Sequence, residues 1–190
     1  MSNKTAPANG SAPDLTSGRR RFLATSAAAA TATASGLLAT TASAATCPDK
    51  QWVNLGVPWE ASYGYVQAIR VGDTIYVSGQ LSHDDTGKLV APAPVDANGK
   101  VVDFSNMGLQ MRQAYANATK VLKLLGFTMA NVVEETLLVL DVDTAFAVAG
   151  DIRRQAYGSN MPIVTSTMLA TPRLAFVGQL IEIKFVARVI

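Results

Sequence analysis

The chain has 190 residues, of which 49% are hydrophobic and 16% are charged, and its formal net charge at pH 7 is +2. A single cysteine excludes a disulfide within the chain and a metal site built on cysteines, and a single histidine leaves no convincing ligand set for a transition metal. We therefore expect no metal and no cofactor.

The first 44 residues predict an export signal rather than folded protein. A polar segment rich in proline, glycine and serine precedes Arg19-Arg20-Arg21-Phe22-Leu23, and a weakly apolar stretch without charge follows. This pattern resembles the twin-arginine export signal, although Gly18 stands where serine is usual. Ala42-Ser43-Ala44 supplies the small residues that a signal peptidase needs, so we expect cleavage after Ala44.

A permanent membrane anchor is the alternative to a cleaved leader. A spanning helix needs about 20 strongly apolar residues, whereas this segment is diluted by threonine and serine. A lipid anchor on Cys47 is disfavoured because Thr46 precedes the cysteine where a small Gly, Ala or Ser is usual. We expect a periplasmic or secreted protein that meets the membrane only transiently, during export.

The leader carries most of the excess positive charge. It holds four of the 16 basic residues and one of the 14 acidic residues, which leaves 12 basic and 13 acidic residues in the mature chain. A nearly neutral chain offers no basic face for nucleic acid, so we expect no nucleic-acid partner. Residues 45–61 are predicted to form an N-terminal segment, and residues 62–190 have the length of one domain.

The first predicted elements are a β-hairpin and a helix. Two β-branched runs, Val66 to Val71 and Thr74 to Ser78, flank Gly72-Asp73, a pair suited to a tight turn. A long loop from Asp84 to Asp103 follows, with three turn signals rich in glycine or proline. Ser105 is predicted to cap a helix that ends at Gly126. Its apolar positions follow the spacing of one buried face: Met111, Ala114, Tyr115, Ala118, Val121, Leu122 and Leu125.

The remaining elements complete an α+β pattern. We predict a strand over Val132 to Leu140, a helix over Thr144 to Tyr157, and strands over Val164 to Leu169 and Leu180 to Val189. In the second helix Phe146, Val148, Ala149, Ile152 and Ala156 are predicted to point inward. This order predicts a single sheet with two helices on one face. Because the other face would lack a cover within the chain, we expect an oligomer.

Several familiar catalytic motifs are absent from the sequence. It has no Gly-x-Ser-x-Gly nucleophile elbow, no dinucleotide-binding glycine motif and no phosphate-cradling loop. Ser78, His83 and Asp84 could form a catalytic triad on paper, but they are nearly contiguous, and a triad needs a base folded back onto the nucleophile. His83 is therefore predicted to be a solvated loop residue.

The order and spacing of several short motifs resemble the RidA/YjgF family over roughly residues 62–190. They are Gly72-Asp73, Tyr76-Val77-Ser78-Gly79-Gln80, Gln113 to Asn117, Leu124-Leu125-Gly126, Val132-Val133 through Thr136 to Asp141, Tyr157, Pro162 and Ile181-Glu182-Ile183. The resemblance implies a chorismate-mutase-like α+β fold and a homotrimer whose sheets pack into a central barrel. It also implies three clefts for a small-molecule ligand, each between neighbouring subunits.

Members of this family that hydrolyse reactive enamines and imines share a recognisable site. An arginine in a Pro-x-Arg-Ser/Thr motif holds the substrate carboxylate, and a glutamate on the last strand orients the attacking water. A tyrosine and the serine of Ser-Gly-Gln complete the pocket. The resemblance places Tyr65 and Ser78 on the tyrosine and the serine, and Gly79 can offer its backbone N–H.

The sequence departs from this pattern at two positions. Val164 stands at the arginine position, beside Thr165 and Ser166, and this change removes a charge-assisted pair worth about 1.5–3 kcal/mol. Lys184 stands at the glutamate position, and Glu182 lies two residues earlier on the same strand face.

Two cations are candidates to replace the missing arginine. Lys184 could supply a cation or, if desolvated, an amine nucleophile, and the alternative is a lysine that reaches solvent. Arg173, in the turn before the last strand, is the second candidate, and its alternative is a surface turn residue.

Three hypotheses for the function follow. The first is hydrolysis of a small imine, enamine or related labile adduct, with Tyr65, Ser78 and Lys184 as catalytic residues. Its ligand-binding residues would be Gly79, Val164, Thr165, Ser166, Arg173 and Glu182. The alternatives are a non-catalytic periplasmic trimer that binds a small molecule and a structural trimer with an empty cleft.

Overall fold

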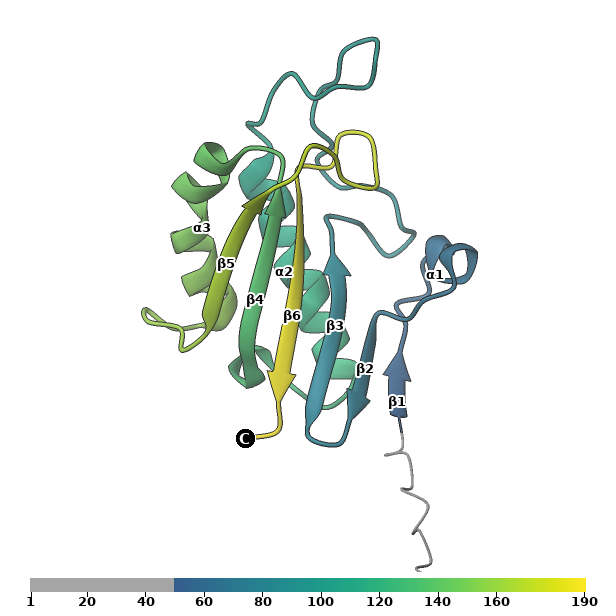
Figure 1. Ribbon diagram of the computed structural model, residues 1–190, viewed down its shortest axis with the longest axis vertical. Coiled ribbons are helices and arrows are strands. Elements are labelled where there is room, and N and C mark those ends of the chain that lie inside the picture. Colours follow the sequence, from purple (N-terminus) through teal and green to yellow (C-terminus); the bar gives the residue numbers. More distant parts are fainter. Residues whose placement is uncertain (1–49) are drawn as a thin grey trace, which may run out of the picture. The chain divides into compact units, whose positions relative to one another are not determined.

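The computed structural model describes residues 50–190, so the predicted leader, its cleavage site and Cys47 lie outside the described residues. No helix within residues 50–190 is long and apolar enough to span a membrane. The elements, in chain order, are β1 (Lys50–Val53), α1 (Pro58–Tyr63), β2 (Ala68–Val71), β3 (Thr74–Gln80), α2 (Met107–Leu124), a short 3-10 helix (Met129–Asn131), β4 (Val132–Val139), α3 (Val142–Tyr157), β5 (Thr165–Ala170) and β6 (Ile181–Arg188) (Figure 1).

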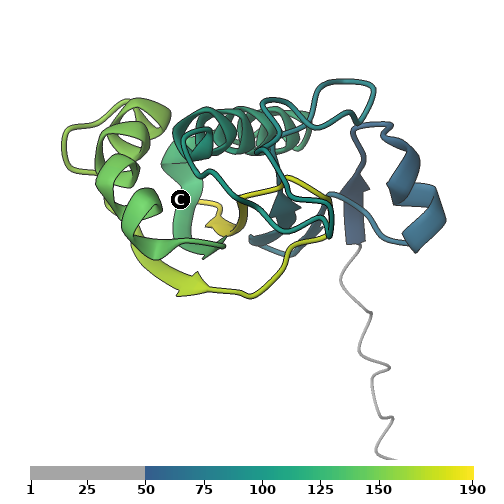
Figure 2. The ribbon, with the colours of Figure 1, turned by 90° about the horizontal axis from the view of Figure 1, so that it is seen from above.

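The strands form one six-stranded sheet in the order β1-β2-β3-β6-β4-β5. Only β4 and β5 pair in parallel, and the other neighbours are antiparallel. Helices α2 and α3 cover the same face of the sheet (Figure 2). The predicted α+β fold, one sheet with two helices on one face, is therefore confirmed.

The core lies between this sheet face and the two helices. Alternate residues of β6, Ile181, Ile183, Phe185 and Ala187, are fully buried, as expected of a strand with one covered face. They pack in one cluster with the apolar stripe of α2, which includes Met107, Met111, Ala114, Tyr115, Ala118, Val121 and Leu122.

The other sheet face has no cover among the described residues. The strand register aligns one row of side chains across the sheet: Trp52, Ile69, Tyr76, Val186, Glu134 and Thr165. Trp52 is 61% exposed and Tyr76 is 47% exposed. We call this surface the open face. It is the face for which the sequence predicts a partner, and the assembly remains a prediction.

The helix starts differ from the sequence-based expectation because the caps differ. Ser105 does not cap α2, since its N–H and its hydroxyl both bond the Asp103 carboxylate, and the helix begins at Met107 after Asn106. Helix α3 begins two residues earlier than predicted. There the Asp141 side chain accepts the Thr144 N–H at 2.8 Å, as an N-cap residue does.

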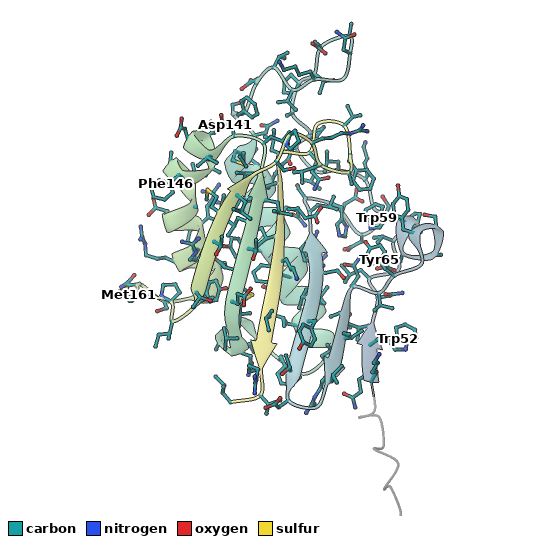
Figure 3. The ribbon with its side chains drawn as sticks, in the orientation of Figure 1. Trp52, Trp59, Tyr65, Asp141, Phe146 and Met161 are labelled. Carbon is teal, nitrogen blue, oxygen red and sulfur yellow. The ribbon has the colours of Figure 1, made fainter. Side chains whose placement is uncertain are left out.

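One further expectation about the packing is wrong: Phe146, predicted to point inward from α3, is 76% exposed (Figure 3). Within the predicted N-terminal segment, residues 50–61 contain β1, which pairs with β2, and most of α1. Proline at the start of α1 suits the first helical turn. The Glu60 carboxylate accepts the backbone N–H groups of Leu55 and Gly56 at 2.8 and 2.9 Å, which ties α1 to the turn that follows β1.

Candidate functional site

A β-bulge forms the centre of the candidate site. Val77 lies opposite Phe185 and Gln80 lies opposite Ile183, so β3 holds one residue more than β6 between these pairs. Ser78 and Gly79 therefore both face the single residue Lys184. Bulges of this kind bend a strand and redirect its side chains, and they are frequent beside active sites.

Glu182 and Lys184 share the open face of β6, because Ile183 between them and Phe185 after them point into the core. The Glu182 carboxylate lies directly over Gly79: a Cβ atom built on this glycine would be 1.9 Å from Glu182 Oε1. Gln179 Nε2 donates to Glu182 Oε2 at 3.3 Å and holds the carboxylate from the other side. Lys184 is exposed, and no salt bridge within residues 50–190 involves it.

Tyr65 lies at the edge of a small apolar cluster. The cluster consists of Val57, Trp59 and Leu81 with Leu55, Leu89 and Phe176 around them, and Figure 3 shows Trp59 and Tyr65 close together near α1. Burial raises the pKa of the Tyr65 hydroxyl above its usual value, and the carboxylates of Glu60 and Glu182 act in the same direction. The phenol therefore keeps its proton and can donate it in a hydrogen bond.

A pair of buried amides stands behind Tyr65. Gln67 Nε2 donates to the Tyr65 hydroxyl oxygen at 3.5 Å, and Gln80 Nε2 donates to Gln67 Oε1 at 2.7 Å. Because Gln67 supplies a donor to this oxygen, the phenol proton is left to point elsewhere. Gln67 and Gln179 were not predicted from the sequence. Each could have been noticed as a polar residue in an apolar context, since Gln67 interrupts one predicted strand and Gln179 directly precedes another.

Ser78 makes a structural hydrogen bond rather than a link to a base. Its hydroxyl donates to the Val66 carbonyl at 2.8 Å, which leaves the oxygen as an acceptor toward the open face. His83 is 3% exposed, so its prediction as a solvated loop residue is wrong. Its ring packs edge-on against Trp59 at 5.1 Å, and its Nδ1 is 2.7 Å from the Asp84 carbonyl oxygen. A Ser-His-Asp triad is thereby excluded.

The predicted residues around β5 lie apart from Ser78 within one chain. Val164 packs against the main core, Thr165 Oγ1 donates to the Val133 carbonyl at 3.0 Å, and the Ser166 hydroxyl accepts from Arg153 at 2.7 Å. Strands β6 and β4 separate β5 from β3. A ligand could touch both groups only if a second copy of the chain brought its β5 edge to the β3 bulge. Their role therefore stays a prediction.

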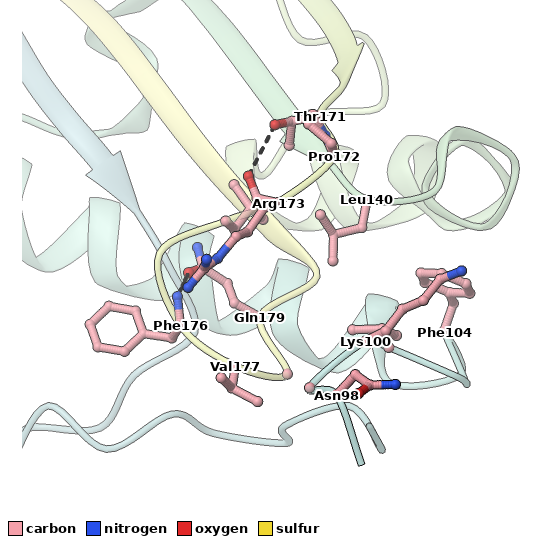
Figure 4. Close-up of a pocket in the computed structure, with 14 residues that line it drawn as sticks. Asn98, Lys100, Phe104, Leu140, Thr171, Pro172, Arg173, Phe176, Val177 and Gln179 are labelled. Atoms are coloured by element: carbon pink, nitrogen blue, oxygen red, sulfur yellow. Dashed lines mark hydrogen bonds between the residues drawn. The ribbon is translucent and has the colours of Figure 1, made fainter. Parts of the chain in front are cut away.

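Arg173 belongs to a different region. It lines a cavity of about 410 Å³ formed by the loop around Lys100 and the loop that follows β5 (Figure 4). None of Tyr65, Ser78, Gly79, Glu182 or Lys184 lines this cavity.

A buried charged cluster that the sequence analysis missed connects the helices to the sheet. Glu135 on β4 is fully buried and accepts hydrogen bonds from Tyr115 at 2.9 Å, from Tyr157 at 3.0 Å and from Arg153. Its four members come from α2, β4 and α3. Within residues 50–190, no group of three or more His, Cys, Asp or Glu side chains is arranged to hold a metal ion.

Comparison with known proteins identifies the family. The family model described as Endoribonuclease L-PSP matches residues 57–189. The chain belongs to this family, known as RidA/YjgF. Among solved structures of the family, Rv2704 from Mycobacterium tuberculosis is 25% identical, with a TM-score of 0.55 over 74% of this chain and 100% of that one. The Rid protein YyfA from Yersinia pestis is 26% identical, with a TM-score of 0.58 over the same shares of the two chains.

Curated RidA relatives carry the name 2-iminobutanoate/2-iminopropanoate deaminase. The human protein is 34% identical over 125 residues, which are 65% of this chain and 78% of the relative. The goat protein is 34% identical over 98 residues, which are 52% of this chain and 62% of the relative. The matched part thus spans less than two thirds of the goat protein's length, and the same holds for the bovine protein at 62%.

Proposed function

We propose that this RidA-family protein hydrolyses small reactive imines or enamines in a cleft that a neighbouring subunit completes beside the β3 bulge. The observation that carries the proposal is the grouping of Glu182, Lys184 and Ser78-Gly79 at one bulge. Burial, followed by the Glu60 and Glu182 carboxylates, raises the pKa of Tyr65, so its phenol is available as a donor. The names of the curated relatives support the same reaction class.

Each group has a chemical task in this proposal. Hydrolysis requires water to add to the C=N carbon, after which the tetrahedral carbinolamine expels ammonia and leaves a carbonyl. Glu182 accepts a proton from the attacking water and returns it to the nitrogen, while Tyr65 donates a hydrogen bond to that nitrogen. The hydroxyl proton of the carbinolamine moves to the nitrogen as ammonia leaves, so both protons of the water end on ammonia. The cleft contributes by holding water and substrate in contact, which converts a bimolecular encounter into a positioned one.

Lys184 takes the place of the missing arginine as the cation for a substrate carboxylate. Lys184 is exposed, so its side chain remains a charged ammonium that can pair with a carboxylate. A nucleophilic amine would instead require a desolvated lysine. An ammonium is a point charge and lacks the planar two-pronged geometry of a guanidinium, so it holds a carboxylate less firmly. We therefore expect weak selection for 2-imino acids over uncharged imines.

The proposal includes a homotrimer and export through the twin-arginine pathway. The open face, with Trp52 and Tyr76 exposed, supports burial against another copy of the chain. A neighbouring β5 edge would then bring Val164, Thr165 and Ser166 to the cleft. The twin-arginine pattern and the small residues before Ala45 support export.

The test uses imines made in the reaction vessel by an amino-acid oxidase. Oxygen is exhausted to stop the oxidase, and release of ammonia from the remaining imine is followed with and without the purified protein. We expect acceleration, and a loss of about 10²–10⁴-fold in the Glu182→Gln variant. Lys184→Gln should raise the KM for 2-iminopropanoate about tenfold and leave the KM for an uncharged imine unchanged. Lys123→Gln, at an exposed site near the end of α2, is the matched control.

The exposure of Lys184 also favours a second candidate, a non-catalytic protein that binds a small molecule. The same assay separates the two. If the protein leaves the rate of ammonia release unchanged for every imine tried, the hydrolase proposal is lost and the binding function remains.

A further inference from the structure

A preformed cavity of about 410 Å³ lies at the end of the sheet where β4 and β5 finish and β6 begins (Figure 4). One wall is the loop from Asn98 to Phe104, and the facing wall is the loop from Thr171 to Gln179. Leu140, which follows β4, lies between the two walls (Figure 4). The volume falls within the range of known small-molecule sites.

Specific contacts hold the loop from Thr171 to Gln179 against Ala93 and against α2. The Ala93 N–H donates to the Gly178 carbonyl at 2.9 Å, and the fully buried Gln110 donates to the same carbonyl at 2.8 Å. Gln110 Oε1 also accepts the Leu180 N–H at 2.8 Å. Gly178 has a φ of +79°, and a Cβ atom there would be 2.9 Å from the Ala93 carbonyl oxygen, so only glycine permits this approach. These contacts fix the wall of the cavity that carries Arg173.

The cavity is lined by two cations and no carboxylate. Lys100 and Arg173 stand on opposite loops, and neither takes part in a salt bridge within residues 50–190. Asp103 and Asp96, the acidic residues nearest to Lys100 in sequence, do not line the cavity. The Asp103 carboxylate accepts the Ser105 N–H at 2.8 Å and the Ser105 hydroxyl at 3.0 Å. The Asp96 carboxylate accepts the backbone N–H groups of Asn98 and Lys100 at 2.8 and 2.9 Å. The Arg173 carbonyl accepts the Thr171 hydroxyl at 3.0 Å, which fixes the turn that carries the guanidinium.

The rest of the lining is mostly apolar. Val101, Phe104, Leu140, Leu174, Phe176 and Val177 contribute to it. An apolar surface between two cations without acidic partners suits a molecule that carries one negative group on a hydrocarbon body.

We propose that this cavity binds a small organic carboxylate with an apolar body. Its carboxylate pairs with the Arg173 guanidinium, its body lies against Leu140 and Phe176, and Lys100 adds positive charge on the facing wall. The site is separate from the cleft at the β3 bulge and does not depend on the imine hydrolysis proposed there. Phe176 lines the cavity and also packs against Trp59 with ring centres 5.0 Å apart, so it touches both regions.

The test is calorimetric titration of the full chain with phenylacetate, phenylacetamide and acetate. We expect phenylacetate to bind. Phenylacetamide lacks the charge and acetate lacks the apolar body, so each should bind at least about tenfold more weakly. Absence of phenylacetate binding, or equal affinity for phenylacetate and either analogue, overturns the proposal.

Variants locate the binding in the cavity. Lys100→Gln and Arg173→Gln should each weaken phenylacetate binding about tenfold or more, and Lys123→Gln should leave it unchanged. Both lining residues are exposed, so these variants should unfold at the parental urea concentration. Leu174→Trp should fill the space and abolish binding. Parental affinity in all three lining variants would place the bound phenylacetate elsewhere and refute the assignment.

Discussion

The contact between Gly79 and Glu182 gives the sharpest test of the cleft. In Gly79→Ala the new methyl carbon would be 1.9 Å from Glu182 Oε1, 2.5 Å from its Cδ and 2.7 Å from its Cγ. Real carbon contacts need about 3.5 Å or more, so the carboxylate must move by more than about 1 Å. The φ of Gly79 is not positive, so alanine itself fits the backbone there and the displacement of Glu182 is the main effect.

Such a displacement should lower kcat/KM for imine hydrolysis about 10²-fold, because a shift of this size in a positioned group has that effect on the rate. The unfolding free energy should change by less than about 1 kcal/mol, since Glu182 is only partly buried and can rotate away. The assay is ammonia release, combined with urea unfolding of the same preparation.

Gly150→Ala in α3 is the matched control. Its new Cβ meets no atom closer than 3.6 Å, and a helical Gly→Ala change should stabilise the fold by about 1 kcal/mol without affecting the rate. If Gly79→Ala keeps parental kcat/KM, Glu182 has no part in the chemistry and the roles proposed for the cleft are wrong.

Three further predictions concern stability and assembly. Arg153→Met should lower the free energy of unfolding in urea by about 3 kcal/mol, because it leaves the buried Glu135 carboxylate without its cation. Arg154→Met removes an exposed ion pair and should lower it by less than about 1 kcal/mol. Equal losses in the two variants would contradict this assignment. Burial and the Glu135 carboxylate raise the pKa of the Tyr115 and Tyr157 hydroxyls above the unfolded value of 10.0. Their contribution to stability should therefore be complete below about pH 10 and decline above it, and a urea midpoint unchanged across that range would refute the assignment. Sedimentation should show a trimer that Tyr76→Lys dissociates, and a parental monomer would exclude burial of the open face.

Regular periodicity made most of the fold predictable. The stripe of α2 and the alternation in β6 identified which side chains reach the core, because burial on one face imposes a period of 3.6 or 2. The single sheet and the shared helix face followed from the order of these elements. Phe146 was misplaced because the stripe of α3 is narrow: of its residues only Ala145, Ala149 and Ile152 are buried.

Strand β1 and helix α1 were not predicted because no regular pattern marks them. β1 depends on pairing with β2, and α1 is held by hydrogen bonds to the single side chain of Glu60. β1 has only four residues and shows no alternation of buried and exposed positions. It is held by pairing with β2 across a gap that contains α1. His83 was misread for a similar reason, since Trp59 on α1 covers its ring.

The candidate site was predicted by family resemblance and only in part by pattern. Ser78, Gly79, Glu182 and Lys184 do gather at one place, but the bulge that brings two residues opposite Lys184 leaves no mark in the sequence. Arg173 and Lys100 line one cavity although they lie on separate loops, and Gly178 lets the loop after β5 pack closely against Ala93. Such contacts between loops depend on tertiary packing, which periodicity does not report.

The extra residue in β3 also governs everything that follows it in the strand. A strand without it would turn Gln80 toward solvent, because a shift of one residue exchanges the two sides of a sheet. Gln80 would then no longer support Gln67 behind Tyr65, and Leu81 would leave the cluster around Trp59. The number of residues between Val77 and Gln80 therefore sets the position of the side chains that follow the bulge. A deletion of one residue here should displace Gln80 and Leu81 from their contacts, although both side chains would still be present in the sequence.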